Sequence, residues 1–292
     1  MPGPLRIFDT RLRDQHRRRA LRHPVPGADF LFRAIAEDVR ERLGAVKRRF
    51  ATATEIAPRP VLAGSDQVDA IVRIDRLAET APDVAGDEEL LPLAPQSVDL
   101  IASVLSLHLV NDLPGALAQI RRALKPDGLF LGAMLGGETL TELRQSFFVA
   151  ESELDGGASP RVAPFAELRT AGALLRRAGF ALPVIDQDRR TVRYDSALGL
   201  MRDLRAMGCA NSLVERDRRP LRREVLARAV AVYAERFADL DGRVRATFDV
   251  ISFSGWAPHE SQQQPLKPGS AKARLADALK TVERPAGEKA GD

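Results

Sequence analysis

Residues 98–109 read VDLIASVLSLHL, an almost continuous apolar run that decides the fold. Such a run is typical of a strand buried on both faces, as in a parallel sheet covered by helices. Asp112 then caps a predicted helix, and the stretch KPDG at 125–128 ends it. A second buried strand is predicted at 129–134. Strand, helix and strand in this order predict a parallel βαβ unit.

The same alternation continues toward the N-terminus. Apolar residues recur at spacings of three and four within 31–46, which predicts a helix, and Asp29 precedes it as a candidate cap. Strands are predicted at 51–56 and 68–74, and a short third strand is predicted near Val84. The chain is therefore expected to form an open, doubly wound, mostly parallel α/β sheet of the Rossmann-like type.

The C-terminal half follows a less regular order. Periodicity and alternation predict a helix at 165–178, a strand at 184–194, helices at 196–207 and 220–237, and one or two strands at 243–256. The last residues are polar and rich in proline, glycine and lysine, which predicts a tail. We therefore divide the chain into a basic N-terminal arm (1–28), an α/β domain (29–265) and a polar C-terminal tail (266–292).

The composition excludes several classes of protein. The chain has 292 residues, a formal net charge of +4 from 44 basic and 40 acidic residues, and a single cysteine. One cysteine excludes an intrachain disulfide framework and a cysteine-rich zinc module. The four histidines are scattered, so no metal site is predicted, and no apolar run reaches the ~18 residues of a membrane span. We expect a soluble protein of a reducing compartment, the cytoplasm.

The N-terminal arm is rich in arginine. Seven arginines and two acids lie between Arg6 and Arg22, and the first serine is Ser65. A mitochondrial transit peptide is rich in serine and poor in acids, so this interpretation is rejected. The arm is expected to bind the acidic surface of a protein partner; the alternative is a solvated helix that packs its few apolar residues on the domain. Because no aromatic residues are interleaved with the arginines, nucleic acid is not expected as a partner.

Several blocks of the sequence resemble one family. LKPDG (124–128), taken with residues 87–92 and 98–108, is similar to class I S-adenosylmethionine-dependent methyltransferases. Three longer blocks narrow the resemblance to bacterial relatives of the mitochondrial complex I assembly factor: IFDTRLRDQHRRRAL (7–21), SLHLVNDLPGALAQIRRALKPDG (106–128) and SGWAPHESQQQPLKPGSAKARLADAL (254–279). That factor is an arginine hydroxylase with a methyltransferase fold and a cousin of the malonyl-acyl-carrier-protein methyltransferase.

The resemblance implies a fold, a cofactor and a partner. The fold is the class I methyltransferase sheet with a helical N-terminal arm and a C-terminal elaboration, and the cofactor is S-adenosylmethionine. The function is the modification or chaperoning of a protein substrate, a subunit of respiratory complex I. The alternatives are a catalytically silent assembly factor with a degenerate cofactor pocket, and a small-molecule or acyl-carrier methyltransferase. The resemblance leaves open whether the chain methylates, hydroxylates or performs no chemistry.

Three residues are candidate cofactor contacts. Asp75 ends the second predicted strand, where a carboxylate can accept hydrogen bonds from both ribose hydroxyls. Asp87 matches the family's adenine contact, and Ser103 lies on the floor of the expected crevice. Glu88 and Glu89 are interpreted as a solvated acidic turn. The three candidates follow strands or end them, which is where ligands bind in such sheets.

The loop after the first strand departs from the family's pattern. The family has an acid followed by spaced glycines, which let the backbone approach the cofactor, whereas residues 54–64 read TEIAPRPVLAG. Glu55 is the displaced acid, Gly64 is the single glycine, and two prolines remove backbone donors. Too few residues remain for a full-length helix before the next strand. We therefore expect weak cofactor binding, unless Arg59 pairs with the cofactor's carboxylate.

The sequence offers three candidates for a catalytic residue: His108, His259 and Glu260. His108 is either a base or cofactor contact, or a structural histidine on an apolar strand. Trp256, His259 and Glu260 form an aromatic, imidazole and carboxylate cluster that either seals a substrate pocket or covers a sheet edge. In both cases the block 254–279 is expected to fold back onto the domain.

Overall fold

The computed structural model describes residues 6–56, 59–263 and 280–281. The chain divides into two units, Met1–Pro258 and His259–Asp292. The helices and strands named below all belong to the first unit. The boundaries expected for the arm, the domain and the tail remain predictions.

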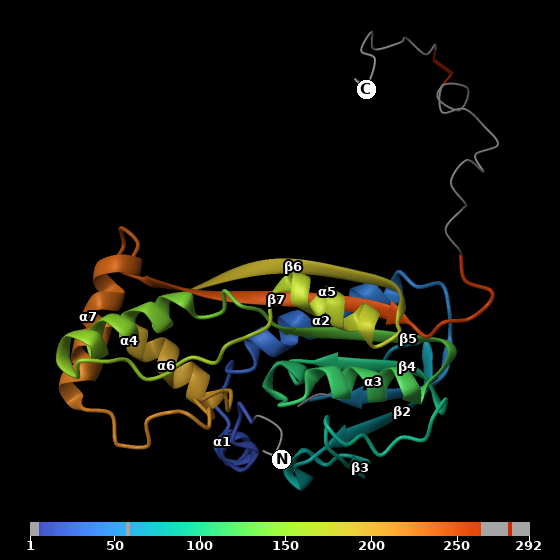
Figure 1. The fold of residues 1–292 in the computed structure, drawn as a ribbon, viewed down its shortest axis with the longest axis horizontal. Helices are drawn as coiled ribbons and strands as arrows, with labels where there is room; N and C mark the ends of the chain where they lie inside the picture. The colour runs from blue at the N-terminus through green and yellow to red at the C-terminus, as the bar shows by residue number, and fades with distance from the viewer. Residues whose placement is uncertain (1–5, 57–58, 264–279, 282–292) are drawn as a thin grey trace, which may run out of the picture. The chain divides into compact units, whose positions relative to one another are not determined.

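A seven-stranded sheet forms the centre of the first unit, in the order β3-β2-β1-β4-β5-β7-β6 (Figure 1). The first five strands in this order pair in parallel, whereas β7 runs antiparallel to both β5 and β6. The strands are β1 (Phe50–Ile56), β2 (Val68–Asp75), β3 (Val84–Ala85), β4 (Val98–Val104), β5 (Leu124–Leu135), β6 (Ala181–Tyr194) and β7 (Val244–Trp256). The doubly wound, mostly parallel sheet predicted from the sequence is confirmed.

Helices pack on both faces of the sheet. They are α1 (Thr10–Arg22), α2 (Phe30–Gly44), α3 (Leu113–Ala123), α4 (Thr141–Leu154), α5 (Leu168–Arg177), α6 (Ala197–Ala206) and α7 (Arg223–Phe237), with 3-10 turns η1 (Ala78–Thr80) and η2 (Leu107–Leu109). One core joins α3 and α5 to the sheet through residues such as Leu117 and Leu175. A second core joins α2, α4, α6 and α7 to the sheet, with Ile35 and Phe147 among its members.

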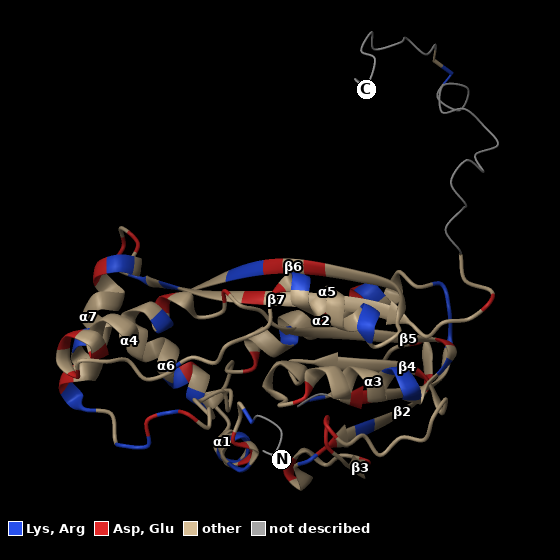
Figure 2. Ribbon diagram, viewed as in Figure 1, with Lys and Arg blue, Asp and Glu red and all other residues tan. Residues whose placement is uncertain are grey.

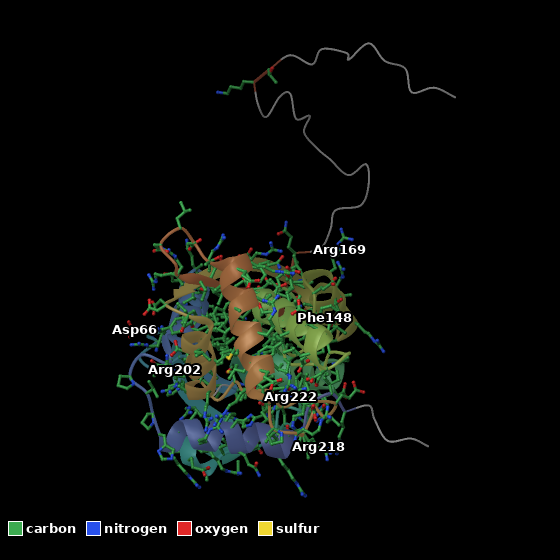
Figure 3. The ribbon with its side chains drawn as sticks, turned by 90° about the vertical axis from the view of Figure 1, so that its left-hand side faces the viewer. Asp66, Phe148, Arg169, Arg202, Arg218 and Arg222 are labelled. Carbon is green, nitrogen blue, oxygen red and sulfur yellow. The ribbon has the colours of Figure 1, made fainter. Side chains whose placement is uncertain are left out.

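Most predicted elements are confirmed, with ends shifted by a few residues. Asp112 caps α3, because its carboxylate accepts a hydrogen bond of 2.8 Å from the Gly115 N–H. Asp29 does not cap α2 with its side chain as predicted, and pairs instead with Arg33 at 3.2 Å. The sequence pattern does not predict α4, whose apolar stripe is blurred because Phe148 lies on its outer side and is 61% exposed (Figure 3).

The connection from β1 to β2 contains no helix in its described part, residues 59–67. Parallel strands are usually joined through a helix. Here the chain returns through turns, and the side chains of Val61 and Leu62 are fully buried in the core on the α2 face. The predicted lack of room for a full-length helix is confirmed. The helix N-terminus that commonly faces a bound anionic group in such folds is therefore absent from residues 59–67.

Candidate functional site

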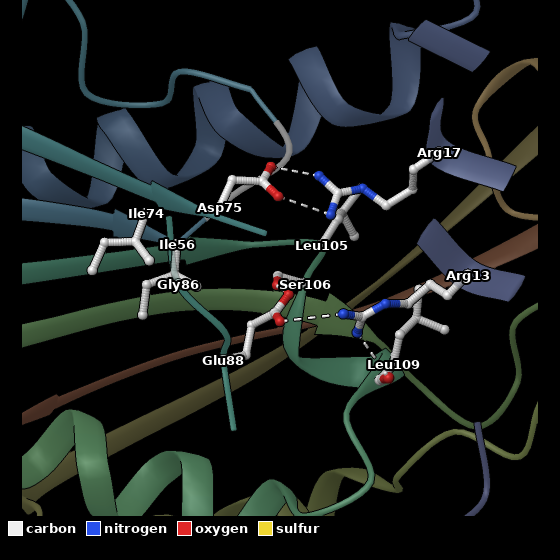
Figure 4. Close-up of a pocket in the computed structure, with 10 residues that line it drawn as sticks. All are labelled: Arg13, Arg17, Ile56, Ile74, Asp75, Gly86, Glu88, Leu105, Ser106 and Leu109. Atoms are coloured by element: carbon white, nitrogen blue, oxygen red, sulfur yellow. Dashed lines mark hydrogen bonds and ion pairs between the residues drawn. The ribbon is translucent and has the colours of Figure 1, made fainter. Parts of the chain in front are cut away.

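A cavity lies at the carboxyl ends of β1, β2 and β4, with α1 beside it (Figure 4). Its lining includes Ile56 and Ile74 from the strands, Glu88 from the loop after β3, and Arg13 and Arg17 from α1. The cavity has a volume of about 30 Å³. Since one water molecule needs roughly 10–15 Å³ of such space, the cavity has room for two or three waters. Its position is the one where doubly wound sheets bind ligands.

Asp75, the candidate ribose ligand, is held by an arginine of α1. The Arg17 Nη1 lies 3.1 Å from Oδ1 of Asp75, and the Arg17 Nη2 lies 2.5 Å from Oδ2 (Figure 4). The Leu77 N–H also donates to Oδ1, at 3.0 Å. The Asp75 side chain is only 4% exposed. Both carboxylate oxygens of Asp75, which a ribose would need, therefore already accept hydrogen bonds from the two terminal nitrogens of the Arg17 guanidinium.

A second pair joins α1 to the crevice. Arg13 approaches Glu88 at 3.4 Å through Nη2 and donates to the Leu109 carbonyl at 3.1 Å through Nη1. The other carboxylate oxygen of Glu88 accepts a hydrogen bond of 2.5 Å from the Ser106 hydroxyl. Glu88 is 8% exposed, so its interpretation as part of a solvated turn is wrong. Sequence spacing gives no signal for this contact, because the partner lies 75 residues away.

Asp87, the candidate adenine contact, is also paired. Its carboxylate contacts the Arg76 guanidinium and accepts a hydrogen bond of 2.9 Å from the Glu89 N–H. Arg76 in turn lies 3.3 Å from Asp14 of α1. Figure 2 shows the resulting mixture of acidic and basic residues around α1 and the ends of β2 and β3. The adenine-binding role of Asp87 remains a prediction.

The segment before α1 fixes the start of that helix. The Asn111 side-chain oxygen accepts hydrogen bonds of 2.8 Å from the N–H groups of Ile7 and Phe8. The Asp9 N–H donates to the Ser212 carbonyl at 2.8 Å. Phe8 is 3% exposed. It therefore packs on the domain, as predicted by the alternative in which the arm packs its few apolar residues there. The N-terminal arm is thus a part of the domain surface.

Four of the arm's arginines are directed to acids of the same chain. Besides Arg13 and Arg17, Arg18 and Arg22 pair with Glu79 at 3.3 and 3.6 Å. The expectation that the arm offers its arginines to a partner is therefore corrected for these four. The physical reason is that Asp75, Glu79 and Glu88, which end β2 or follow β2 and β3, already pair with these guanidinium groups.

The loop after β1 is held by Glu55. Its Oε1 accepts hydrogen bonds from the N–H groups of Val61, at 2.9 Å, and Leu62, and Glu55 is 1% exposed. Two backbone donors of the loop are thereby used within the chain. Arg59 lies 3.9 Å from Asp29 and does not line the cavity, nor does Gly64. The structure therefore brings neither Arg59 nor Gly64 to the cavity.

Three polar atoms near the carboxyl end of β4 are buried without a hydrogen-bond partner in the described part of the chain: Thr54 Oγ1, Ser103 Oγ and His108 Nδ1. The His108 ring contacts the Phe165 ring edge-on at 5.5 Å. Burial, helped by the charge of Arg13, lowers the pKa of His108 to about 3. His108 is therefore a neutral imidazole at physiological pH. The cofactor role of Ser103 and the catalytic role of His108 remain predictions.

The C-terminal candidates fall in different units. Trp256 ends β7, with its ring 6.0 Å from the guanidinium of Arg48. His259 and Glu260 belong to the second unit, where His259 Nδ1 lies 2.7 Å from the Ser261 hydroxyl. The cluster of Trp256, His259 and Glu260 therefore remains a prediction. Most of the block 254–279, from 264 onward, lies outside the described residues.

No three His, Cys, Asp or Glu side chains in the described part of the chain come close enough together to hold a metal ion. No described helix is both long and apolar enough to cross a bilayer.

Comparison with known proteins first identifies the class. A family model described as a methyltransferase domain matches residues 49–132. The YcgJ protein of Bacillus subtilis superposes with a TM-score of 0.53 at 15% identity, over 76% of this chain and 99% of its own. The fold and the position of the crevice define a protein with the class I S-adenosylmethionine-dependent methyltransferase fold.

Relatives then identify the family. The arginine-hydroxylase NDUFAF5 of Rattus norvegicus, a mitochondrial protein, is 39% identical over 292 aligned residues, 94% of this chain and 84% of its own. That of Danio rerio is 46% identical over 197 residues, 68% of this chain and 61% of its own. The malonyl-[acyl-carrier protein] O-methyltransferase of Laribacter hongkongensis is 37% identical over 219 residues, 75% of this chain and 71% of its own. The chain belongs to the NDUFAF5 family of methyltransferase-fold proteins.

S-adenosylmethionine is the cofactor of this methyltransferase class, but the crevice does not fit it while α1 is in place. The carboxylate of Asp75 is bonded to Arg17, Glu55 uses two N–H groups of the loop, and the cavity of about 30 Å³ has room for only a few waters. A volume of this size is far too small for a nucleoside.

Proposed function

We propose that the protein assists the assembly of respiratory complex I by acting on one of its protein subunits, with S-adenosylmethionine as its cofactor. The single observation that carries the proposal is the 39% identity to rat NDUFAF5 along 94% of this chain. The match includes nearly the whole chain and so extends well beyond residues 49–132, the part common to methyltransferase domains.

The same observation favours a protein substrate over an acyl carrier. The malonyl-acyl-carrier relatives align with 60–75% of this chain at 34–39% identity. The rat, mouse and human hydroxylases align with 92–96% of it at 38–39% identity, and those of Danio rerio and Dictyostelium discoideum align with 65–68% at the higher identity of 42–46%. A similarity that extends through the whole fold supports a shared substrate class more than one confined to part of it.

The chain's own residues have defined tasks in this proposal. Asp75 would hold the ribose hydroxyls and Asp87 the adenine amine of the cofactor, in place of the arginines that these two carboxylates now contact. His108 Nδ1 has no hydrogen-bond partner among the described residues, and in a neutral ring it accepts or donates one hydrogen bond according to the tautomer. The cofactor supplies an activated methyl group when it is bound. We place the protein in the bacterial cytoplasm, next to a membrane only through the subunit it binds.

Deletion of the gene in a bacterium that carries it tests the proposal. We expect less assembled complex I and lower NADH:quinone activity, restored by the wild-type gene. Mass spectrometry of complex I subunits from both strains then separates the chemistries: an arginine peptide heavier by one oxygen indicates hydroxylation, and one heavier by one methylene indicates methylation. Restored assembly without a mass change indicates a silent assembly factor. Normal complex I in the deletion strain contradicts the proposal.

A further inference from the structure

We propose that α1 is a reversible cover of the cofactor crevice, and that Arg17 competes with the cofactor's ribose for the carboxylate of Asp75. S-adenosylmethionine then binds only to molecules in which α1 has moved away. This inference rests on the cofactor named in the proposed function. It adds a regulatory residue that lies outside the methyltransferase domain match at 49–132.

The competition follows from the geometry at Asp75. A ribose diol needs both carboxylate oxygens, and the two nitrogens of Arg17 already lie 3.1 and 2.5 Å from them. With Arg17 in place the Asp75 side chain is 4% exposed, so little of either oxygen is open to a ligand. Arg17 and a ribose therefore exclude each other.

The contacts of α1 are of a kind that can be broken. The buried residues of the helix are Arg13 and Asp14, both charged, and Leu12 and Leu21 are only partly buried. Arg13 Nε and Asp14 Oδ1 are buried without a hydrogen bond and face each other as a long ion pair of 3.8 Å, so the two buried charges of the helix are only weakly compensated. A helix that docks by ion pairs and not by an apolar face gains little from burial. The displacement of α1 from the domain therefore requires little free energy.

The charges left behind favour the proposed ligand. In the docked state three arginines (Arg13, Arg17 and Arg76) face four acids (Asp14, Asp75, Asp87 and Glu88). Without α1, Arg76 alone faces three acids, so the formal charge of the cluster falls from −1 to −2. S-adenosylmethionine carries a sulfonium cation, which a more negative crevice attracts. The open state therefore binds the cofactor better than the docked state on both steric and electrostatic grounds.

The anchors at the start of α1 define how it moves. Residues 7–9 are held by backbone hydrogen bonds to Asn111 and Ser212, whereas the body of the helix is held mainly by its arginines. At the far end the helix runs into a turn in which Gly27 has φ +80°. We therefore expect α1 to swing about its N-terminal end.

Isothermal titration of the full-length protein with S-adenosylmethionine tests the inference. Since minor conformations are commonly populated at about 1–10%, Arg17→Gln should tighten the apparent affinity by about 10- to 100-fold. Arg13→Gln should tighten it in the same direction by less. The matched control is Arg11→Gln, because Arg11 is an exposed residue of the same helix that does not line the cavity, and the affinity of this variant should equal that of the wild type.

A second measurement does not depend on a substitution. In the wild type, saturating S-adenosylmethionine should speed hydrogen exchange of the α1 amides, because the bound state has lost the docked helix. Unchanged or weaker binding by Arg17→Gln overturns the inference, as does slower exchange in α1, which indicates a helix that closes over the cofactor. Absence of binding by every variant also overturns it. The complex I assay is independent of these results, so the two proposals fail separately.

Discussion

Glu55 and Val61 are joined by a hydrogen bond of 2.9 Å from the Val61 N–H to the Glu55 carboxylate, which also accepts from the Leu62 N–H. This contact replaces the glycine-rich loop and helix that usually follow the first strand of the fold. A buried acid thus organises the connection from within, and the loop's donors face the chain instead of a ligand.

Glu55→Ala is expected to destabilise the protein by about 3 kcal/mol, because it leaves two buried N–H groups without an acceptor. Glu55→Gln keeps one acceptor oxygen and should cost less. Urea unfolding measures the loss of unfolding free energy in both variants, provided that the dependence of this free energy on urea concentration is the same as in the wild type. A loss below about 1 kcal/mol in the alanine variant indicates that the loop does not depend on Glu55.

The wild-type protein is expected to bind S-adenosylmethionine weakly. The loop after β1 lacks two of the backbone N–H groups that would donate charge-assisted hydrogen bonds to the carboxylate of the cofactor. At ~1.5–3 kcal/mol each, their loss weakens a micromolar affinity by about two to four orders of magnitude. Asp75→Ala should remove the remaining binding, whereas Asp69→Ala, at an exposed ion pair, should not change it. Saturation at low micromolar cofactor contradicts the expectation of weak binding.

His108 is expected to make the protein less stable in mild acid. Its folded pKa of about 3 lies below its ordinary value of 6.5, so the unfolded chain binds the proton more readily. The stability that the neutral ring contributes is complete above pH 6.5 and is lost as the pH falls toward 3. At pH 5 the loss is about 2 kcal/mol.

The check on His108 is a comparison of unfolding free energies at pH 7 and pH 5. His108→Gln should show a smaller difference between the two pH values than the wild type. His23→Gln serves as the control, because His23 is exposed. Identical pH dependence in all three proteins contradicts the assignment to His108.

Trp256→Ala is expected to lower the melting temperature. The residue ends β7 opposite Leu129 and Ala181, and its half-buried ring lies near Arg48. Loss of its packing and of the cation–π contact should cost about 2–3 kcal/mol. Trp256→Phe should keep most of the stability, and the wild-type fluorescence should be blue-shifted relative to the unfolded chain. An unchanged melting temperature counts against a packed Trp256.

The sheet could be predicted from the sequence because its signals are local. The run 98–109 is apolar on both faces, and Asp112 stands at the correct distance to cap the next helix. Helix α4 could not be predicted in this way, because Phe148 projects outward and no side-chain cap marks its start. Sequence periodicity identifies elements that bury one apolar face, and it fails for a helix that also carries apolar residues on its exposed side.

Only the residues at the strand ends of the candidate site can be predicted from the sequence. Asp75 and Asp87 follow from topology, since ligands bind at the carboxyl ends of parallel strands. Their partners do not, because Arg17 is separated from Asp75 by 58 positions and no periodicity relates them. An arginine-rich segment has the same composition whether it pairs with the chain's own acids or with those of a partner.

The attachment of α1 also orders events during synthesis. The N-terminus emerges from the ribosome first, yet the groups that fix it come later: Asp75 and Glu88 in the first third of the chain, and Arg216, which pairs with Asp9, 207 positions downstream. Domains generally fold as units while the chain is made. The first helix to be synthesised therefore cannot complete its contacts until Arg216 has been made, and its arginines Arg13 and Arg17 are made well before the acids that pair with them.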